Sequence, residues 1–273
     1  MPDIKSRSGL QWHYDVAGTG PNLLFLHGWG VNMMIWRQQY KYFSQQYRTM
    51  MIDLPGHGRS EWRWMTLEQI TQDLEDVLDQ LGMHELTVVG SSFGGLVALK
   101  LYDLYPEMIT RFSLCGTQAK LSYSTDNPFG LEIERIRKLS SQVDADYPGI
   151  INIFFRSLFT KEERATRRFK WLQTFRKTDA MPDKDALANM LEILEKEDLR
   201  EVMFRIDRPI QFINGTEDNL CPLGNFAHIK EKIPQARFDW FHKCGHFPFV
   251  SQPHEYNQIL DNFLKSTNGT QTH

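Results

Sequence analysis

The pattern G-x-S-x-G at residues 90–94 is the feature that most narrows what this chain can fold into. It follows a short apolar run, Leu86–Val89, and precedes a run with helical spacing, Gly95–Tyr105. A serine at such a strand-to-helix turn takes strained backbone angles, and neighbouring backbone segments come close to it. The residues two before and two after the serine must therefore be small, and both are glycine.

Ser92 is the nucleophile that this turn predicts, for attack on an ester carbonyl. Ser91 is the rival, but it would leave Val89 and Phe93 where small residues are required. The turn also points the N-terminus of the next helix at the serine, where free N–H groups stabilise a developing oxyanion. The alternative interpretation is a glycine turn that only joins a strand to a helix.

A serine hydroxyl needs a base, and His246 is the best candidate among nine histidines. It follows the predicted strand 237–241 in a loop fixed by a glycine and a proline, and His242 is the weaker rival. An acid must then hold the imidazole. Asp218 follows the predicted strand 209–214 and a glycine turn, and Glu217 is the adjacent alternative. The three residues then occur along the chain in the order Ser, Asp, His, which is the order found in proteins with a G-x-S-x-G turn.

A second glycine-rich loop, His27-Gly28-Trp29-Gly30, directly follows the predicted strand Asn22–Leu26. We expect the backbone amides of Trp29 and Phe93 to be the two oxyanion donors. His27 more naturally braces this loop, and the turn-rich loop Asp53–Ser60 also has a structural role. These motifs require no cofactor and no metal.

The remaining pattern predicts an α/β fold with a mostly parallel sheet covered by helices on both faces. Further strands are expected at 49–53 and 111–115, and His13 falls in an early strand. Residues 120–204 contain no convincing strand and predict helices at 130–143, 148–158, 161–176 and 183–194. We interpret them as a helical lid inserted between two parts of the core, residues 1–119 and 205–273.

Bulk composition excludes little, but it gives no sign of a nucleic-acid or membrane partner. The net charge is −3, and 41% of the residues are hydrophobic. The three cysteines are widely separated, and the first residues lack an apolar stretch. We therefore expect a cytoplasmic protein.

With these motifs in place, the chain resembles the α/β-hydrolases, and most closely the pimeloyl-acyl-carrier-protein methyl ester esterases of biotin synthesis. The resemblance is carried by His27–Gly30, Asp53–Gly56, the serine turn and the Gly215-x-x-Asp218 turn. Departures are Ser91, where a tryptophan is familiar, and Cys244-Gly245 in place of small alanines. The family implies a serine carboxylesterase that acts on a methyl ester linked to acyl carrier protein.

The resemblance extends into the lid and implies a substrate channel there. The segment 168–174 resembles the part of the family that contacts the acyl chain. By that resemblance the channel would be lined by Phe169, Lys170, Trp171, Leu172 and Gln173, with Trp29, Ser92 and Phe93 at its end.

Charge in the lid points independently to an acidic partner. Residues 156–177 contain eight basic and two acidic residues, a charge of +6 in a protein of net −3. Arg164 and Arg168 are four residues apart, hence on one helix face, and they fall where the family binds its carrier. Such a cluster would steer an acyl carrier protein, although a charge run is more often a solvated helix face.

Other functions share the same residues. A general small-ester hydrolase, a carbon–carbon bond hydrolase and an aminopeptidase use the same triad. A ligand receptor that kept the fold is a different class, which the intact triad disfavours. A nucleophilic aspartate in place of Ser92 would have indicated dehalogenase or epoxide chemistry.

Overall fold

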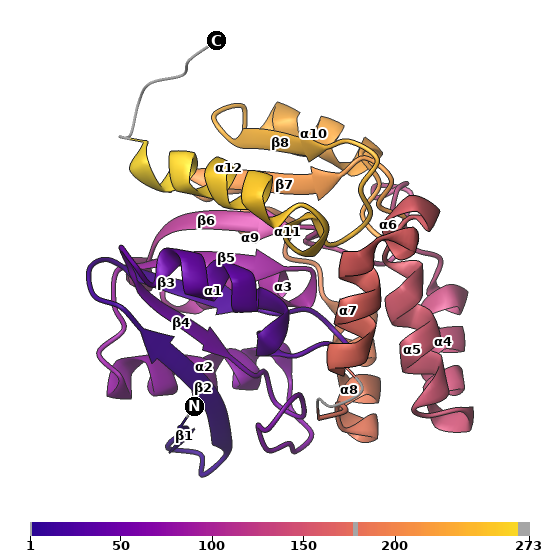
Figure 1. Ribbon diagram of the computed structural model, residues 1–273, viewed down its shortest axis with the longest axis horizontal. Helices are drawn as coiled ribbons and strands as arrows, with labels where there is room; N and C mark the ends of the chain where they lie inside the picture. Colours follow the sequence, from indigo (N-terminus) through magenta and orange to yellow (C-terminus); the bar gives the residue numbers. More distant parts are fainter. Residues whose placement is uncertain (1, 177–179, 267–273) are drawn as a thin grey trace.

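A single eight-stranded sheet organises the protein, as the computed structural model of residues 2–176 and 180–266 shows (Figure 1). The strand order is β1-β2-β4-β3-β5-β6-β7-β8. The first three pair antiparallel, and all later neighbours are parallel. The strands are β1 (Asp3–Lys5), β2 (Gln11–Ala17), β3 (Asn22–Leu26), β4 (Arg48–Ile52), β5 (Leu86–Ser91), β6 (Ile109–Cys115), β7 (Ile210–Gly215) and β8 (Arg237–Phe241).

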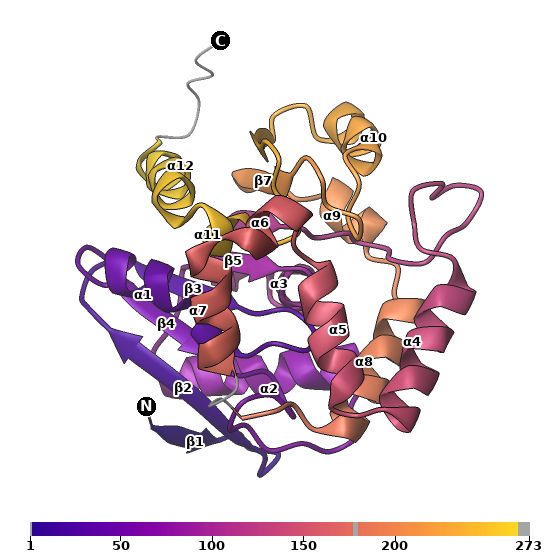
Figure 2. The same cartoon turned by 45° about the vertical axis from the view of Figure 1, so that its right-hand side comes forward.

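Helices cover both faces of the sheet (Figures 1 and 2). In the core they are α1 (Arg37–Phe43), α2 (Leu67–Gln80), α3 (Phe93–Leu104), α10 (Gly224–Lys232), α11 (Pro248–Ser251) and α12 (Pro253–Lys265), with short 3-10 turns η1 (Met33–Trp36) and η2 (Pro106–Met108). Between β6 and β7 lie α4 (Ile133–Ala145), α5 (Gly149–Ser157), α6 (Lys161–Ala165), α7 (Arg167–Arg176), α8 (Lys184–Lys196) and α9 (Arg200–Phe204). In the described residues no helix combines the length and apolar character that a membrane crossing requires.

Strand side chains alternate between two hydrophobic clusters, one on each face of the sheet. Along β3, Leu24 and Leu26 join the cluster that contains α2 and α3, whereas Leu23 and Phe25 join the cluster of α1 and α12. Both sets are completely buried. Burial on both faces explains why the parallel strands are written as continuous apolar runs.

The predicted mostly parallel α/β sheet is confirmed, and six strands lie where the apolar runs placed them. The antiparallel edge strand β1 was not predicted, because three residues, two of them exposed, are too few to show an alternating pattern. Helix α2 begins with a capping box, in which the Thr66 hydroxyl accepts from the Gln69 amide and the Gln69 side chain accepts from the Thr66 amide.

The helix predicted at 161–176 is wrong, because it breaks at Thr166. That residue is extended, with φ −72° and ψ 154°. Its hydroxyl donates to the Glu163 carbonyl at 2.7 Å and accepts from the Phe169 amide at 3.1 Å. Threonine thereby ends α6 and caps α7, which is the usual competition of this side chain with helix continuation.

The helices α4 to α8 lie at the end of the sheet where the parallel strands finish (Figure 1), whereas α9 packs against α3. The two ends of this segment are tied together at its base. Lys120 bridges to Asp198 through the backbone, and their side chains form an ion pair at 3.3 Å. Arg200 adds ion pairs to Asp198 and to Asp126. The segment therefore leaves and re-enters the core at one place.

Candidate active site

Ser92 lies at the turn between β5 and α3, in a backbone conformation that serine rarely adopts. Its φ is +52° and its ψ is −117°. Its amide donates to the Cys115 carbonyl at 2.9 Å, and its carbonyl accepts from Gly95 at 2.9 Å. Strain of this kind persists only where the surrounding structure holds it.

Close backbone contacts explain the glycines that flank the serine. A Cβ built on Gly94 would lie 2.4 Å from the Leu26 carbonyl oxygen and 2.6 Å from that of His27. A Cβ built on Gly90 would lie 2.8 Å from the Gly95 Cα. Because backbone atoms cannot move aside, only glycine allows α3 to start this close to the end of β3.

His246 and Asp218 form a buried pair at the ends of β8 and β7. The His246 Nδ1 lies 2.7 Å from the Asp218 Oδ2. The other carboxylate oxygen accepts from the amides of Leu220 at 2.8 Å and Cys221 at 3.1 Å. Because the carboxylate is fixed at both oxygens, it orients the imidazole with Nδ1–H toward it and Nε2 away.

The rival residues lie elsewhere or make no comparable contact. Glu217 and His242 are exposed, and neither meets the pair. Ser91 is completely buried at the end of β5, and its hydroxyl has no hydrogen-bond partner among the described residues. Ser92 and His246 instead line one and the same cavity.

The two predicted oxyanion amides flank this serine. Phe93 follows it at the first position of α3. On the opposite side, a Cβ built on Gly28, next to Trp29, would lie 3.1 Å from the Ser92 Cβ. Within the described residues neither amide donates to a protein acceptor. Both N–H groups are thus available to a ligand.

Two buried neutral histidines hold the loop that contains Trp29. The His27 Nε2 accepts from the Leu54 amide at 2.9 Å, and its Nδ1 lies 2.8 Å from the Gly28 carbonyl. The His57 Nε2 accepts from the Gly30 amide at 3.2 Å. Burial lowers the pKa of His27 to about 3, helped by the neighbouring His57, and burial lowers the pKa of His57 to about 4. These contacts are those of a brace, as expected for His27.

A cavity of about 220 Å³ extends from Ser92 into the helical segment. Ser92, His246 and Trp29 line it together, and the Trp29 indole donates to the Leu187 carbonyl at 2.9 Å. The rest of its wall is mostly apolar, with side chains of Leu131, Ile136, Leu139, Phe154, Leu191 and Leu194.

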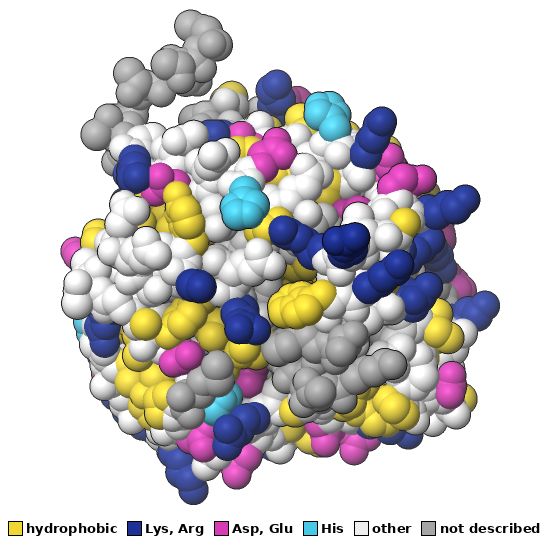
Figure 3. All heavy atoms as spheres, in the orientation of Figure 1, with side chains coloured by type: hydrophobic (Ala, Val, Ile, Leu, Met, Phe, Trp, Pro, Cys, Tyr) yellow, Lys and Arg dark blue, Asp and Glu magenta, His cyan; other side chains and the backbone are white. Residues whose placement is uncertain are grey.

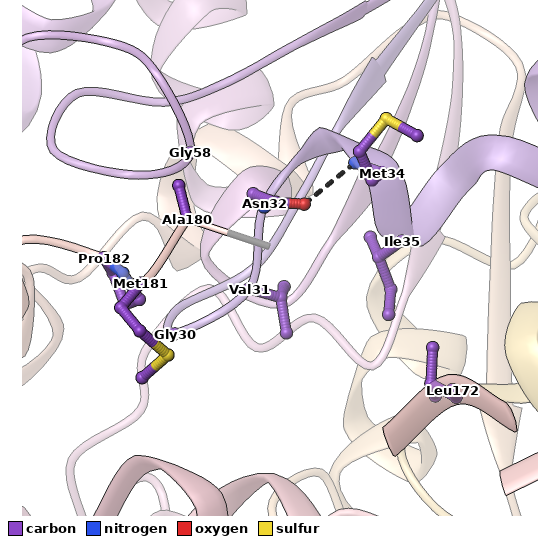
Figure 4. Close-up of a pocket in the computed structure, with 10 residues that line it drawn as sticks. All are labelled: Gly30, Val31, Asn32, Met34, Ile35, Gly58, Leu172, Ala180, Met181 and Pro182. Atoms are coloured by element: carbon purple, nitrogen blue, oxygen red, sulfur yellow. Dashed lines mark hydrogen bonds between the residues drawn. The ribbon is translucent and has the colours of Figure 1, made fainter. Parts of the chain in front are cut away.

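The segment 169–173 does not line this cavity in the described part of the chain, contrary to the predicted channel. Phe169 is buried beside Phe159, with ring centroids 4.9 Å apart, and Trp171 is 47% exposed. Leu172 lines a different hollow with Gly30 and Met181 (Figure 4). Lys170 is exposed and Gln173 is half-buried, and neither lies among the lining residues.

The intervening helix α5 explains this difference. Its Phe154 lines the cavity, whereas the next residue, Phe155, stacks parallel to the Phe169 ring at 6.3 Å on the far side. Helix α5 therefore separates α7 from the cavity. The lining residues of α4 and α8 were missed, although their apolar residues three and four apart indicated a buried face.

Basic side chains gather around α6 and α7, on the face shown in Figure 3. None of the following five forms an ion pair with a described acidic residue: Arg156, Lys161, Arg164, Arg167 and Arg168. We call these five the basic cluster. Lys177, counted in the predicted charge, lies outside the described residues.

The prediction that Arg164 and Arg168 share one helix face is wrong, because they belong to α6 and α7. Arg164 donates to the carbonyls of Phe159 and Arg156 at 3.0 and 3.1 Å. Arg168 donates to the Val250 carbonyl at 3.3 Å. Both guanidinium groups are half-buried and held in place, but their charge is not neutralised.

Glu163 is a contact residue that the sequence analysis missed. It is buried in α6, and its Oε2 accepts from the Gly245 amide at 3.0 Å and from the Thr160 amide at 2.6 Å. Its Oε1 lies 3.0 Å from the Cys244 Sγ. The adjacent His246 amide donates to the Leu158 carbonyl at 2.8 Å. The capping box Thr160-x-x-Glu163 was the signal available in the sequence.

Comparison with known proteins gives a family and close relatives. Residues 21–253 match the model of the alpha/beta hydrolase fold. The chain is 30% identical to a pimeloyl-acyl-carrier-protein methyl ester esterase of Nitrosomonas europaea, over 91% of this chain and 98% of that protein. It is also 30% identical to the protein of the same name from Aromatoleum aromaticum, over 90% and 98% respectively.

Solved structures show the same fold at lower identity. An esterase from Exiguobacterium antarcticum superposes with a TM-score of 0.88 at 21% identity, covering 97% of this chain and 99% of that one. A bromoperoxidase from Bacillus anthracis gives 0.87 at 22%, covering 97% and 100%. The two proteins are named for different activities, so this likeness concerns the fold alone.

The histidine brace predicts a loss of stability in acid. Below pH 6.5 the unfolded chain protonates both histidines, whereas folded His27 and His57 stay neutral down to about pH 3 and 4. The free energy of unfolding should therefore fall between pH 6.5 and 4, by up to about 1.4 kcal/mol per pH unit for each histidine. Urea denaturation at pH 7 and pH 5 measures this. In His57→Gln the free energy of unfolding should differ less between pH 7 and pH 5 than it does in the wild type. An unchanged difference in this free energy would contradict the assignment of His57 as a buried neutral histidine.

Glu163 should matter to turnover through the loop that carries His246. Glu163→Ala leaves the buried Gly245 N–H and the part-buried Thr160 N–H without this acceptor, at a cost of about 1–3 kcal/mol for the buried group, and releases that loop. We expect a lower Tm, and we expect kcat to fall by a larger factor than KM rises. Glu163→Gln keeps a hydrogen-bond acceptor and should recover most of the lost Tm and most of the lost kcat. The exposed neighbour Glu162→Ala is the control, and equal kcat in both alanine variants would refute this role.

Proposed function

Because the chain belongs to the pimeloyl-acyl-carrier-protein methyl ester esterases, a family of α/β-hydrolases, we propose that it is a serine carboxylesterase acting on a methyl ester. One observation carries this proposal. A strained serine at a helix N-terminus shares a cavity with a histidine that is hydrogen-bonded to a buried carboxylate.

The first half-reaction forms an acyl-enzyme. The Ser92 Oγ attacks the ester carbonyl carbon while the His246 Nε2 takes the hydroxyl proton. Asp218 stabilises the resulting imidazolium through the 2.7 Å hydrogen bond at Nδ1. When the tetrahedral intermediate collapses, the C–O bond to the methoxy group breaks and His246 returns the proton to it. Methanol leaves, and the acyl group stays on Ser92.

The negative charge that develops on the carbonyl oxygen is received by two amides. Those of Trp29 and Phe93 have no other acceptor among the described residues. Donors fixed before the reaction need no reorganisation, which is the main source of such stabilisation. The brace of His27 and His57 serves this purpose by fixing the loop around Trp29.

Water completes the reaction from the same groups. His246 removes a proton from a water molecule, whose oxygen attacks the acyl carbon on Ser92. The second tetrahedral intermediate expels the Ser92 oxygen, which takes the proton back from His246. The free acid leaves, and the enzyme returns to its starting state.

The identity of the ester is the finer part of the proposal. The relatives named above act, by their names, on a pimeloyl chain carried by acyl carrier protein. The mostly apolar cavity at Ser92 suits a methylene chain, and the basic cluster suits an acidic carrier. We therefore infer that the substrate is a carrier-linked dicarboxylate methyl ester. The cytoplasmic location stays a prediction, consistent with three free, buried cysteines.

Ser92→Ala tests the nucleophile. Hydrolysis of a chromogenic ester should fall by at least about 10³-fold, as it does when a triad nucleophile is lost. Ser91→Ala is the matched control, because it removes the same hydroxyl from the neighbouring residue. That variant should stay near wild-type activity. If the two variants lose activity to the same extent, or if Ser92→Ala stays active, the assignment fails.

Charge reversal tests the carrier. Arg164→Glu with Arg168→Glu should lower kcat/KM about tenfold or more on a carrier-linked methyl ester while sparing a small chromogenic one. Added salt should reduce the wild-type advantage, because long-range steering is screened.

Two further variants make this comparison specific. Lys161→Glu with Arg167→Glu changes the charge equally without breaking the carbonyl contacts of Arg164 and Arg168. Lys230→Glu with Lys232→Glu applies the same change on the exposed end of α10. The first pair should reproduce the loss and the second should not. An equal effect of both pairs, or an equal effect on both substrates, would refute docking on the basic cluster.

A further inference from the structure

The cavity at Ser92 is mostly apolar, with one permanent charge in its wall. Of the described side chains that line it, Arg135 alone is a lysine, arginine, aspartate or glutamate. It lies in the first turn of α4, next to the lining residues Leu131 and Ile136. In both cartoon views α4 is an outer helix of its segment, on the side away from β3 and β4 (Figures 1 and 2).

The protein itself does not use the Arg135 charge. Among the described residues its guanidinium has no ion pair and no hydrogen bond. Its neighbour Arg137, by contrast, pairs with Glu195 at 2.6 Å. A cation in the first turn also opposes the helix dipole, which is positive at that end. Arg135 is exposed to solvent, and no described acidic residue neutralises its charge.

Two acidic residues flank Arg135 along the chain, Glu132 at the N-cap of α4 and Glu134 in its first turn. Neither of them lines the cavity, so the charge in this part of the wall is the guanidinium. An acyl chain bound with its ester at Ser92 would run along Leu131, Ile136 and Leu139 toward that charge. A negative group at its far end would meet Arg135 there, whereas a purely hydrocarbon end would leave the cation unpaired.

We propose that Arg135 is a specificity-determining residue that selects esters whose acyl chain carries an anionic group at the end remote from the ester. This inference rests on the proposed esterase function and names its substrate class more narrowly. Two sources supply such a group. One is the terminal carboxylate of a dicarboxylate half-ester, and the other is the phosphate of a phosphopantetheine arm that carries the chain.

The test compares charged and uncharged esters of equal length. Monomethyl esters of straight-chain dicarboxylic acids are set against methyl esters of monocarboxylic acids with the same number of carbons. On the best half-ester, Arg135→Gln should lower kcat/KM about fivefold, mostly through KM, as expected for loss of one partly exposed ion pair. Neutral esters should change less than twofold.

Reversing the charge of Arg135 should reverse the preference for the charge on the acyl chain. Arg135→Glu should disfavour half-esters further and favour methyl esters that end in an ammonium group. Lys138→Gln is the matched control, because Lys138 is exposed on the same helix and does not line the cavity. It should leave all three ester classes unchanged. Equal losses on charged and neutral esters in Arg135→Gln would overturn the proposal.

Two further experiments are needed. One distinguishes a phosphate from a carboxylate as the anion, and the other distinguishes the role of Arg135 from the esterase function itself. Thioesters of phosphopantetheine and of pantetheine, each carrying the same methyl half-ester, distinguish phosphate from carboxylate as the group that Arg135 contacts. Calorimetry can compare the affinity of half-esters for the Ser92→Ala variant and for the double variant Ser92→Ala with Arg135→Gln. Because neither variant carries the nucleophile, this comparison measures the contact between Arg135 and the anion without turnover. Equal affinities in these two proteins would overturn the role of Arg135 even if esterase activity is found. Absent turnover with unequal affinities would instead count against the esterase function alone.

Discussion

The close approach of α3 to the end of β3 is the constraint on which the site depends. Two backbone segments meet there with no room for a Cβ at Gly94. This contact forces the left-handed conformation of Ser92 and brings the loop of Trp29 to the same place. The amides on either side of the serine are then left without protein acceptors. One steric condition thus exposes the nucleophile and positions both oxyanion donors.

The sequence was sufficient wherever local chemistry decides the structure. Strand β3 is buried on both faces and was predicted at its observed bounds from its apolar run, and the half-buried edge strand β8 was predicted at its observed bounds as well. Ser92, Asp218 and His246 each follow a strand, and parallel strands bring their carboxyl ends to one edge of the sheet. That these three residues lie close together could therefore be predicted from the positions of the motifs after the strands.

Packing between distant segments was beyond the sequence pattern. The helix predicted at 161–176 breaks because the Thr166 side chain competes for backbone groups, which periodicity does not weigh. The segment 169–173 is apolar enough for a channel, but α5 stands between it and the cavity. Likewise, the spacing of Glu163 gave a helix cap, whereas its bond to Gly245 depends on how two segments 82 residues apart fold together.

Positive charge in the helical segment has two physically different forms. The basic cluster lies around α6 and α7 and would act at a distance on the rate of encounter, an effect that salt screens. Arg135 is exposed to solvent but lines the cavity, so an anion bound there would meet it in direct contact. Raising the ionic strength should therefore weaken the first effect much more than the second. A substrate that is both carried by an acidic protein and charged along its acyl arm would use both, so the two proposals together assign the choice of ester to α4 to α7 and its cleavage to Ser92, His246 and Asp218.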